Sequence, residues 1–467
     1  MVGAGPNGLA AAIELARAGR SVRVIERAAE IGGGTRTAEL TLPGFRHDVC
    51  SAVHPLAVGS PFLSKLGLER YGLELIHPPV PCAHPLDDGT AVALRRSLTD
   101  TAQGLGVDGA AYESLIGPFA REWTRLAEFV LGPPLRPPWH PVLAARFGVA
   151  GLNPAQRLAK SSFDGPGTQA LFAGMAAHSF MPLSAPATAA FALVLLALGH
   201  AAGWPVARGG SEAITTAMRR HLEALGGVVE TGREIRSLRD LPDARAILFD
   251  VTPRQLTRIC GEELPHRYRA ALARYRYGPG VFKVDYALSG PVPWRAEECR
   301  HAGTVHLGGT LEEIAAGERS VARGSHAERP FVLTAQQSLI DPTRAPSGKH
   351  TLWAYCHVPN GSDVDMTAAI DAQVERFAPG FRDLVLARAT RGPAQVEAEN
   401  PNCVGGDING GMASLRQTLA RPTARACPYA TPNPKLFICS SATPPGGGVH
   451  GMCGYHAARA ALQRVLR

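Results

Sequence analysis

Apolar and polar positions along the first thirty residues follow two different patterns. Residues 9–17 carry apolar side chains at helical spacing, and Gly19 follows as a candidate C-cap. Residues 21–25 form a short apolar run that is typical of a buried strand, and Glu26 follows it directly. The pattern predicts the helix and second strand of a β-α-β unit.

The first strand of that unit is short in this sequence. Only Met1 and Val2 precede the first glycine, whereas a central strand usually supplies about five residues. Losing about three buried side chains costs several kcal/mol, at roughly 1.5–3 kcal/mol each. We therefore expect either that the natural start lies upstream or that the fold tolerates a stub.

Two further segments repeat the alternation of strands and helices. Residues 212–225 have apolar side chains at helical spacing and are followed by strand-like runs at residues 228–229 and 246–251. Near the C-terminus, residues 435–439 are predicted to form a strand, and a helix is predicted from Val449. A nucleotide-binding fold assembled from three separated segments is expected.

The intervening sequence is richer in proline, aromatic residues and long apolar runs. Residues 187–207 form the longest uncharged apolar stretch, but their dense part is shorter than the roughly 20 residues that span a bilayer. A buried helix is predicted there, with a substrate tunnel or membrane-dipping element as the alternative. In residues 281–286, apolar and polar side chains alternate, which predicts a strand covered on one face. An apolar cavity is expected, with four aromatic candidates for its lining or for ordinary core packing: Trp139, Phe191, Trp204 and Trp294.

Composition excludes several classes of protein. The 467 residues are 45% hydrophobic and 19% charged, a balance typical of a globular chain. The net charge of +8 is spread over scattered arginines, which argues against nucleic-acid binding and favours anionic cofactors or an anionic membrane surface. The nine cysteines form no CxxC pair, which argues against a metal site, a disulfide framework and a disulfide reductase and favours a cytoplasmic protein.

The N-terminal glycines form a G-x-G-x-x-G pattern in the expected context. Gly3 permits a tight turn, Gly5 lets the backbone approach a diphosphate, and Gly8 lets helix and strand pack closely. Free N–H groups of the helix N-terminus attract phosphate. Glu26 can accept hydrogen bonds from both hydroxyls of an adenosine ribose.

A second glycine cluster distinguishes FAD from nicotinamide cofactors. Residues 32–34 supply backbone N–H groups, and Arg36 can neutralise the same anion. Nicotinamide-only dehydrogenases do not need this cluster, whereas the longer FAD molecule runs past its diphosphate. The glycine turn at residues 446–448 places another helix N-terminus where negative charge develops on a reduced flavin. With one dinucleotide loop in the sequence, a second, NAD-binding domain is not expected.

The chain resembles the phytoene desaturase and carotenoid isomerase branch of the FAD-dependent amine-oxidase superfamily. Four segments carry the resemblance, in the order expected for that branch: GGGTRT, RGGSEAI, VGGDINGG and LFICSSATPPGGGVHG. The resemblance covers essentially the whole chain. It implies an α/β fold with a Rossmann-like FAD-binding domain (residues 1–75, 205–255 and 405–467). It also implies a substrate domain with a mixed β-sheet and helices (residues 76–204 and 256–404), an apolar cavity and loose membrane association. The oligomeric state is left open.

The glycine pattern and the resemblance together predict the cofactor-binding residues. One departure is Ser440-Ser441, where the family usually has Gly-Ala or Gly-Asp. The predicted FAD-binding residues are Gly3, Gly5, Pro6, Asn7, Gly8, Glu26, Arg27, Gly32, Gly33, Gly34, Thr35, Arg36, Ile235, Ser441, Gly447, Gly448 and Val449.

Few catalytic residues can be named, because a flavin supplies the hydride chemistry itself. His450 is a weak candidate that could polarise the flavin or donate a proton, or could merely bond the backbone. Asp48 and Cys50 are expected near the flavin ring, and a thioether link through Cys453 is a remote alternative to its packing role. Asp407 is expected either to orient a loop at the cavity mouth or to be a turn residue.

The sequence thus predicts an FAD-dependent oxidoreductase acting on an apolar, carotenoid-, isoprenoid- or lipid-like small molecule. Hydride passing to or from the flavin would desaturate, saturate or isomerise it. A flavin amine or amino-acid oxidase and a non-catalytic flavoprotein scaffold are the alternatives. Peripheral membrane contact is a further expectation.

Overall fold

The computed structural model describes residues 1–134 and 137–466. Four short parallel strands form the nucleotide-binding sheet: β1 (Arg23–Ile25), β8 (Val228–Glu230), β9 (Ile247–Phe249) and β15 (Leu436–Ile438). β1 pairs with β8, and β9 pairs with β15. Val2 forms parallel bridges to both Ile25 and Phe249, so this one residue joins the two pairs. The stub predicted from the sequence therefore completes the sheet.

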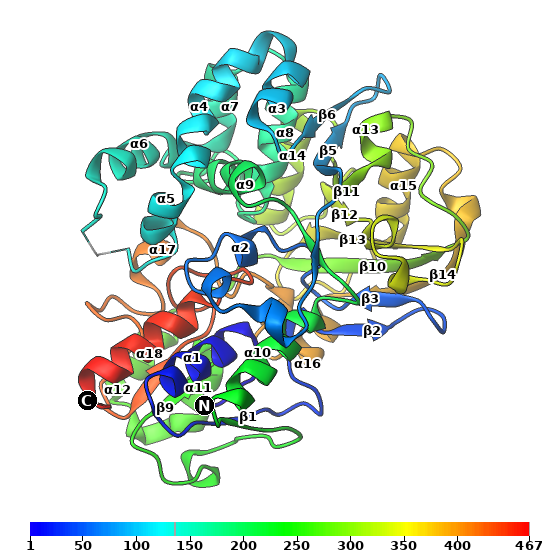
Figure 1. Cartoon of the computed structure of the whole chain (residues 1–467). Coiled ribbons are helices and arrows are strands. Elements are labelled where there is room, and N and C mark those ends of the chain that lie inside the picture. The colour runs from blue at the N-terminus through cyan, green and yellow to red at the C-terminus, as the bar shows by residue number, and fades with distance from the viewer. Residues whose placement is uncertain (135–136, 467) are drawn as a thin grey trace.

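Three helices cover one face of this sheet (Figure 1): α1 (Pro6–Arg17), α10 (Glu212–Ala224) and α18 (Met452–Arg464). α1 packs against both α10 and α18. An ideal Cβ on Gly454 would lie 1.8 Å from the carbonyl oxygen of Asn7, so only glycine permits this approach of α18 to α1. The prediction that α18 starts at Val449 was wrong, because Gly451 adopts a left-handed conformation (φ 68°) immediately before Met452.

The opposite face carries α11 (Pro253–Cys260) and α12 (His266–Leu272). Their apolar side chains, from Leu256 to Tyr275, form one buried cluster with Val2, Phe249 and Ile438 of the sheet. Residues 256–275, which the resemblance placed in the substrate domain, thus pack on the nucleotide-binding sheet. The cause is the amphipathic character of α11 and α12, whose apolar sides need this sheet as a partner.

The second half of the molecule is built on a seven-stranded sheet in the order β14-β10-β13-β12-β11-β5-β6. Its pairings are antiparallel except for the parallel pair β11 and β5, so the predicted mixed sheet is confirmed. The strands are β5 (Val80–Pro85), β6 (Ala91–Leu94), β10 (Gly280–Leu288), β11 (Ala302–Leu307), β12 (Val332–Ala335), β13 (His350–Val358) and β14 (Val385–Arg391).

β10 is buried on both faces, so the prediction of a strand covered on one face was wrong. Phe282, Val284 and Tyr286 pack into an apolar cluster with residues of α15 (Thr367–Phe377). Lys283 and Asp285 point to the other face, where Asp285 lies 3.6 Å from His47 of the nucleotide-binding half. The alternation thus separates an apolar face under helices from a polar face against the other half, rather than core from solvent.

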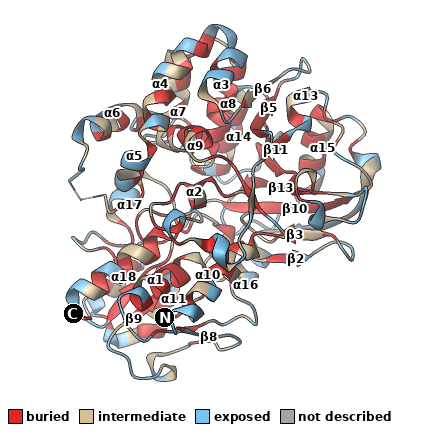
Figure 2. Cartoon of the chain, in the orientation of Figure 1, coloured by how far each residue is buried: buried red, intermediate tan, exposed pale blue. Residues whose placement is uncertain are grey.

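A helical layer lies beside the seven-stranded sheet (Figure 1). At its centre, α9 (Ala189–Ala201) is buried against other helices of the layer, which confirms the predicted buried helix (Figure 2). No helix in the described ranges is long and apolar enough to cross a membrane. The other helices of the layer are α3 (Leu98–Gly104), α4 (Gly109–Arg121), α5 (Trp123–Val130), α6 (Pro141–Gly151), α7 (Ala155–Ser162), α8 (Pro166–Ala177) and α14 (Leu311–Ala322).

The remaining strands and helices are short. They are β2 (Thr37–Glu39), β3 (Arg46–Asp48), α2 (Pro55–Val58), β4 (Leu75–Ile76), β7 (Val206–Ala207), α13 (Glu297–Arg300), α16 (Pro393–Glu399) and α17 (Leu415–Ala420). The β2–β3 hairpin touches β13 through β3, which brings the face of the large sheet that carries Lys283 and Asp285 against the nucleotide-binding half.

Candidate functional site

Two adjoining pockets run from the nucleotide-binding sheet to the large sheet. They share five lining residues: Gly5, Gly33, Asp250, Asn400 and Asn402. We call the outer one, around Glu26 and Ile235, the adenosine pocket, and the inner one, around Cys50, His178 and Tyr355, the inner cavity. The shared residues make the two pockets one continuous groove.

The glycine loop begins this groove, as the sequence predicted. Gly3 adopts φ +97°, and an ideal Cβ on Gly8 would lie 2.2 Å from the carbonyl oxygen of Gly3. Gly8 therefore serves close packing of α1 on the loop, while Gly5 lines both pockets and Pro6 and Asn7 line the inner cavity. The backbone N–H of Gly8 donates to Asp250 Oδ2 at 2.9 Å.

Glu26 is held rigidly at the carboxyl end of β1. Its Oε2 accepts from the backbone N–H of Ala4 at 2.8 Å and its Oε1 from that of Ala28 at 2.9 Å. The carboxylate lines the adenosine pocket beside Ile235, which is buried. This is the position from which a carboxylate can accept hydrogen bonds from ribose hydroxyls.

Arg27 and Arg36 line the adenosine pocket from the side of α16. Arg36 Nη2 donates to the carbonyl oxygen of Glu399 at 3.0 Å, and Arg27 reaches the carbonyl oxygens of Ala398 and Glu399 at 3.4 and 3.5 Å. Both guanidiniums thus lie at the rim, where they add positive charge to the entrance for an anionic cofactor.

The second glycine cluster touches the first. Gly32 and Gly33 have positive φ, and an ideal Cβ on Gly33 would lie 3.4 Å from the Cα of Gly5. Gly34 and Thr35 line the inner cavity, whereas Gly32 supports them by accepting a hydrogen bond from the Thr35 hydroxyl. The two loops together form the narrow part of the groove.

The C-terminal turn supplies the floor of the inner cavity through Ser441, Gly448 and Val449. Gly447 lies behind them, since an ideal Cβ there would lie 2.8 Å from the carbonyl oxygen of Asn409. Asp407 lines the same cavity, and its carboxylate accepts backbone hydrogen bonds from Gly278 and Asn409. It holds a loop at the cavity through Gly278, and the bond from Asn409, two residues on, also makes it a turn residue.

Two predicted residues of this turn face away from the cavity. His450 is buried, its Nδ1 accepts from the backbone N–H of Met452 at 3.0 Å, and burial lowers its pKa to about 4. Cys453 directs its Sγ at the carbonyl oxygens of Thr443 and Gly446, each at 3.4 Å. Neither side chain lines the cavity in the described structure, so His450 acts in the turn and Cys453 packs.

Cys50 lines the inner cavity as expected, but Asp48 does not. Asp48 is fully buried, where its carboxylate pairs with Arg344 at 2.9 Å and accepts from the backbone N–H of Ser211 at 2.7 Å. A buried guanidinium 296 residues away in sequence thus holds Asp48 outside the cavity lining, whereas it was expected near the flavin ring.

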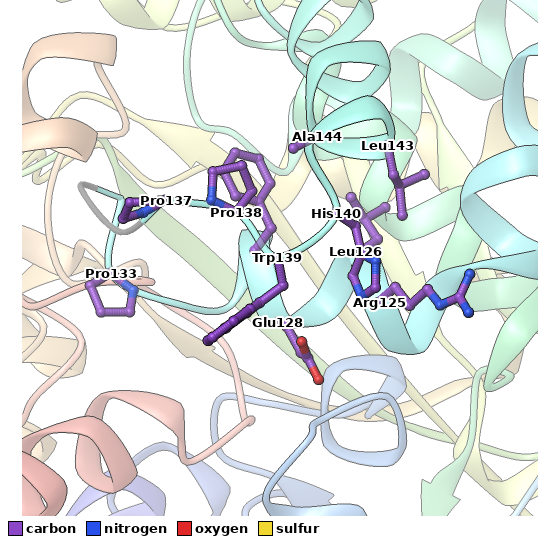
Figure 3. A pocket seen from close by; sticks show the side chains of 11 residues that line it. Arg125, Leu126, Glu128, Pro133, Pro137, Pro138, Trp139, His140, Leu143 and Ala144 are labelled. Carbon is purple, nitrogen blue, oxygen red and sulfur yellow. The ribbon is translucent and has the colours of Figure 1, made fainter.

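Of the four aromatic candidates, Trp204 alone lines the cavity in the described structure. Trp294 is buried under the opposite face of the sheet and donates to Gln336, and Phe191 lies half-buried on α9. Trp139 is 72% exposed and lines a shallow surface pocket with Pro137 and Pro138 (Figure 3). The sequence identified these aromatic residues as hydrophobic but did not indicate which of them line the cavity.

The aromatic wall of the inner cavity comes instead from residues that sequence reasoning missed. Phe180, Trp353 and Tyr355 line it, with Leu195 and Leu333. Trp353 and Tyr355 alternate along β13 and so project from one face of the sheet, with their rings 5.1 Å apart and nearly perpendicular. The period-2 pattern of β13 was the available signal. No local signal distinguishes His178, which also lines the cavity.

Asp250 is the other missed residue, and it lines both pockets. It follows β9 directly, at the carboxyl edge of the parallel sheet where ligands of such folds bind. Burial raises its pKa to about 7, although the hydrogen bond from Gly8 opposes this shift. The uncharged acid is therefore compatible with a neighbouring diphosphate.

These residues fit FAD. The glycines leave room for a diphosphate where the two loops meet, and Glu26 faces the adenosine pocket. The groove then continues into the inner cavity, which is lined by aromatic side chains. A shorter cofactor would leave the second glycine cluster and the C-terminal turn without a ligand.

Comparison with known proteins supports this assignment. Residues 1–61 match the family model of the NAD(P)-binding Rossmann-like domain. Over 98% of its length the chain is 26% identical to mouse pyridine nucleotide-disulfide oxidoreductase domain-containing protein 2, of which it covers 92%. It is 23% identical to one of the chains of limonene dehydrogenase from Castellaniella defragrans, covering 99% of this chain and 94% of that one.

Solved structures share the fold. An oxidoreductase from Methanosarcina mazei matches with a TM-score of 0.67 at 16% identity over 99% of both chains. Putrescine oxidase bound to putrescine matches with a TM-score of 0.63 at 17% identity, covering 100% of this chain and 98% of that one. The chain thus has the fold of these oxidoreductases, and fold and groove together support the predicted FAD.

Proposed function

We propose that this protein is an FAD-dependent oxidoreductase that desaturates, saturates or isomerises an apolar, isoprenoid-, carotenoid- or lipid-like molecule. One observation carries the proposal: the cofactor groove opens into a cavity with a wall of Phe180, Leu195, Leu333, Trp353 and Tyr355. Such a wall favours burial of hydrocarbon over binding of a strongly hydrated substrate.

The chain's own residues would hold the cofactor and shield the reaction. Glu26 and the two glycine loops would bind the adenosine and diphosphate ends, and Ser441, Gly448 and Val449 would lie against the flavin end. Bound FAD supplies the hydride acceptor or donor. The aromatic wall orients the apolar substrate and keeps water out, which favours direct hydride transfer over side reactions.

Among the relatives, limonene dehydrogenase is named for an apolar terpene. This supports the proposed substrate class.

Anaerobic reduction of the bound flavin tests the proposal. The FAD-loaded protein is mixed with farnesol, β-carotene, putrescine or cyclohexylamine, and the visible flavin absorbance is followed by stopped flow. We expect bleaching with an isoprenoid and none with the amines. A saturating reaction is covered by reducing the flavin first with dithionite and following its reoxidation by the same compounds. Bleaching by the amines alone would contradict the proposal, and no change in either direction would favour a scaffold.

A flavin amine oxidase is the second candidate, because amine oxidases are among the structural neighbours and Trp353 and Tyr355 present perpendicular rings in the cavity. Two observations count against it. Lys283 Nζ already lies 5.5 Å from the Trp353 ring, so a cation faces that aromatic system. Both oxygens of the Asp407 carboxylate accept from backbone N–H groups, and burial raises the pKa of Asp250 to about 7, so neither residue offers a ready anionic partner to an ammonium.

We also propose a cytoplasmic location with peripheral membrane contact. All nine cysteines are free thiols, which fits a reducing compartment. The outer face of α6 presents Val142 and Val149, which are 83% and 77% exposed, beside Trp139. An exposed apolar helix face with a tryptophan at its edge is typical of contact with a lipid surface.

A further inference from the structure

Two side chains on the substrate side of the inner cavity end in polar groups with no protein partner among the described residues. We propose that His178 and Tyr355 bind an uncharged oxygen atom of the substrate, so that the substrate is an apolar molecule carrying a carbonyl, hydroxyl or ether oxygen. This inference rests on the proposed function and specifies its substrate class. A pure hydrocarbon would leave both polar groups without hydrogen bonds.

His178 follows α8 and is fixed from behind by a second histidine. Its Nε2 lies 3.2 Å from Nε2 of His306, which is fully buried on β11. Its Nδ1 has no partner among the described residues and is not enclosed by protein. Because His178 is half-buried and lines the inner cavity, its Nδ1 is open to that space.

The surroundings of His306 decide which nitrogen of His178 carries the proton. His306 Nδ1 is buried without a hydrogen-bond partner in the described structure, and an ideal Cβ on Gly174 would lie 2.8 Å from it. A Cα hydrogen of Gly174 therefore points at Nδ1 of His306. There is room there for a lone pair on Nδ1 but not for an N–H hydrogen. Neutral His306 then carries its proton on Nε2 and donates it to Nε2 of His178.

The consequence is a hydrogen-bond donor in the cavity. With its Nε2 accepting, neutral His178 must carry its own proton on Nδ1. Burial lowers the pKa of His178 to about 3, and nearby His357 adds to this shift, so the ring stays neutral near pH 7. His178 thus presents a neutral N–H to a substrate.

Tyr355 supplies a second donor from the sheet. Across the sheet, Leu333 is paired with His306 on one side and with Tyr355 on the other. The three side chains therefore share one face. The Tyr355 hydroxyl makes no hydrogen bond in the described structure and is not enclosed by protein, although the residue is only 5% exposed; burial raises its pKa above the usual range. It remains an O–H donor.

The donor pair selects an uncharged acceptor. Neutral donors in an apolar wall do not compensate the desolvation of a carboxylate or phosphate. The ammonium nearest to this part of the sheet, on Lys283, is paired with Asp285 and does not line the cavity. Within the described structure, the cavity therefore favours carbonyl, hydroxyl or ether oxygen over an anion.

Binding of three matched probes tests the inference: farnesol, farnesyl methyl ether and the hydrocarbon farnesene. Quenching of tryptophan fluorescence in the FAD-loaded protein measures the Kd of each, because Trp204 and Trp353 line the cavity. We expect farnesol and its ether to bind about tenfold or more tightly than farnesene, since a site built for an oxygen rejects the analogue without it. The ether has no donor, so its binding shows that the protein donates.

The variants are His178→Phe and Tyr355→Phe, which keep the size of each ring. Each should weaken binding of farnesol and the ether about tenfold and leave farnesene unchanged or tighter. Tyr455→Phe removes a hydroxyl outside the cavity and should change nothing. Flavin absorbance and melting temperature report whether each variant folds.

Equal binding of all three probes by the parent protein would overturn the oxygen site and leave the proposed function standing. Failure of every isoprenoid probe, with quenching by putrescine or cyclohexylamine, would overturn both. Retention of the oxygen preference in the folded double variant would also overturn the assignment to His178 and Tyr355.

Discussion

Asp250 brings a carboxyl group against the glycine loop at the amino end of α1. Its Oδ2 accepts from the backbone N–H of Gly8, and ideal Cβ atoms on Gly3 and Gly5 would lie about 3 Å from it. Burial raises its pKa to about 7, so the group is mostly neutral below that pH and mostly charged above it. A charged Asp250 would repel the diphosphate of FAD.

We therefore expect FAD to bind most tightly below pH 7, with Kd rising up to about tenfold per pH unit above it. Asp250→Asn should remove this dependence and retain tight binding at pH 8.5. Titration of the cofactor-free protein with FAD from pH 5.5 to 8.5 measures it, with Asp88→Asn at an exposed turn as the control. A flat Kd in the parent protein would contradict the prediction.

Residues whose role depends on neighbours in sequence could be predicted. Gly3, Gly8 and Glu26 act within one β-α-β unit, so spacing alone located them. Asp48 and His178 depend on partners 296 and 128 residues away, and no local pattern reports those partners.

Among the elements, α6 is unusual because its outward face exposes two valines, with Arg146 as the one charged residue between them. Val142 and Val149 lie two turns apart on it, and Leu152 follows at 54% exposure. Figure 2 shows α6 at the outer edge of the helical layer. Exposing apolar side chains of this kind to water is unfavourable, whereas burying them in the headgroup region of a bilayer is favourable.

The double variant Val142→Glu, Val149→Glu should co-sediment with phosphatidylglycerol-containing vesicles about fivefold less than the parent chain. The matched control is Val364→Glu with Leu386→Glu, two exposed apolar residues in the other part of the molecule. Equal loss in both double variants would indicate a general charge effect, and no vesicle binding by the parent chain would refute the contact.

At the level of elements, periodicity identified the helices and strands but not what covers them. The alternation along β10 was correct as a separation of two faces, yet both faces are buried. Periodicity indicates that the two faces of a strand differ in polarity. It does not indicate whether another part of the chain covers the more polar face.

The whole molecule depends on contacts between its two halves, and Arg344 forms a fully buried one. Its guanidinium pairs with Asp48 of the nucleotide-binding half and with Asp341 of the other half, each at 2.9 Å, and all three side chains are enclosed. The order of the three nucleotide-binding segments could be predicted from their motifs. The contact of Arg344 with Asp48 and Asp341 could not, because it joins residues from separate segments and no sequence motif marks it.

Arg344→Met should lower stability by about 3–5 kcal/mol, because it leaves two buried carboxylates without a cation. Arg208→Met removes a guanidinium from an exposed pair with Glu74 and should cost no more than about 1 kcal/mol. Urea denaturation followed by tryptophan fluorescence measures both variants, and flavin release reports the nucleotide-binding half separately. Asp48→Asn with Asp341→Asn in the Arg344→Met background removes the stranded charges and should recover much of the loss. If Arg344→Met were no more harmful than Arg208→Met, the two halves would be held by their apolar contacts, and the ion pairs would contribute to orientation rather than to stability.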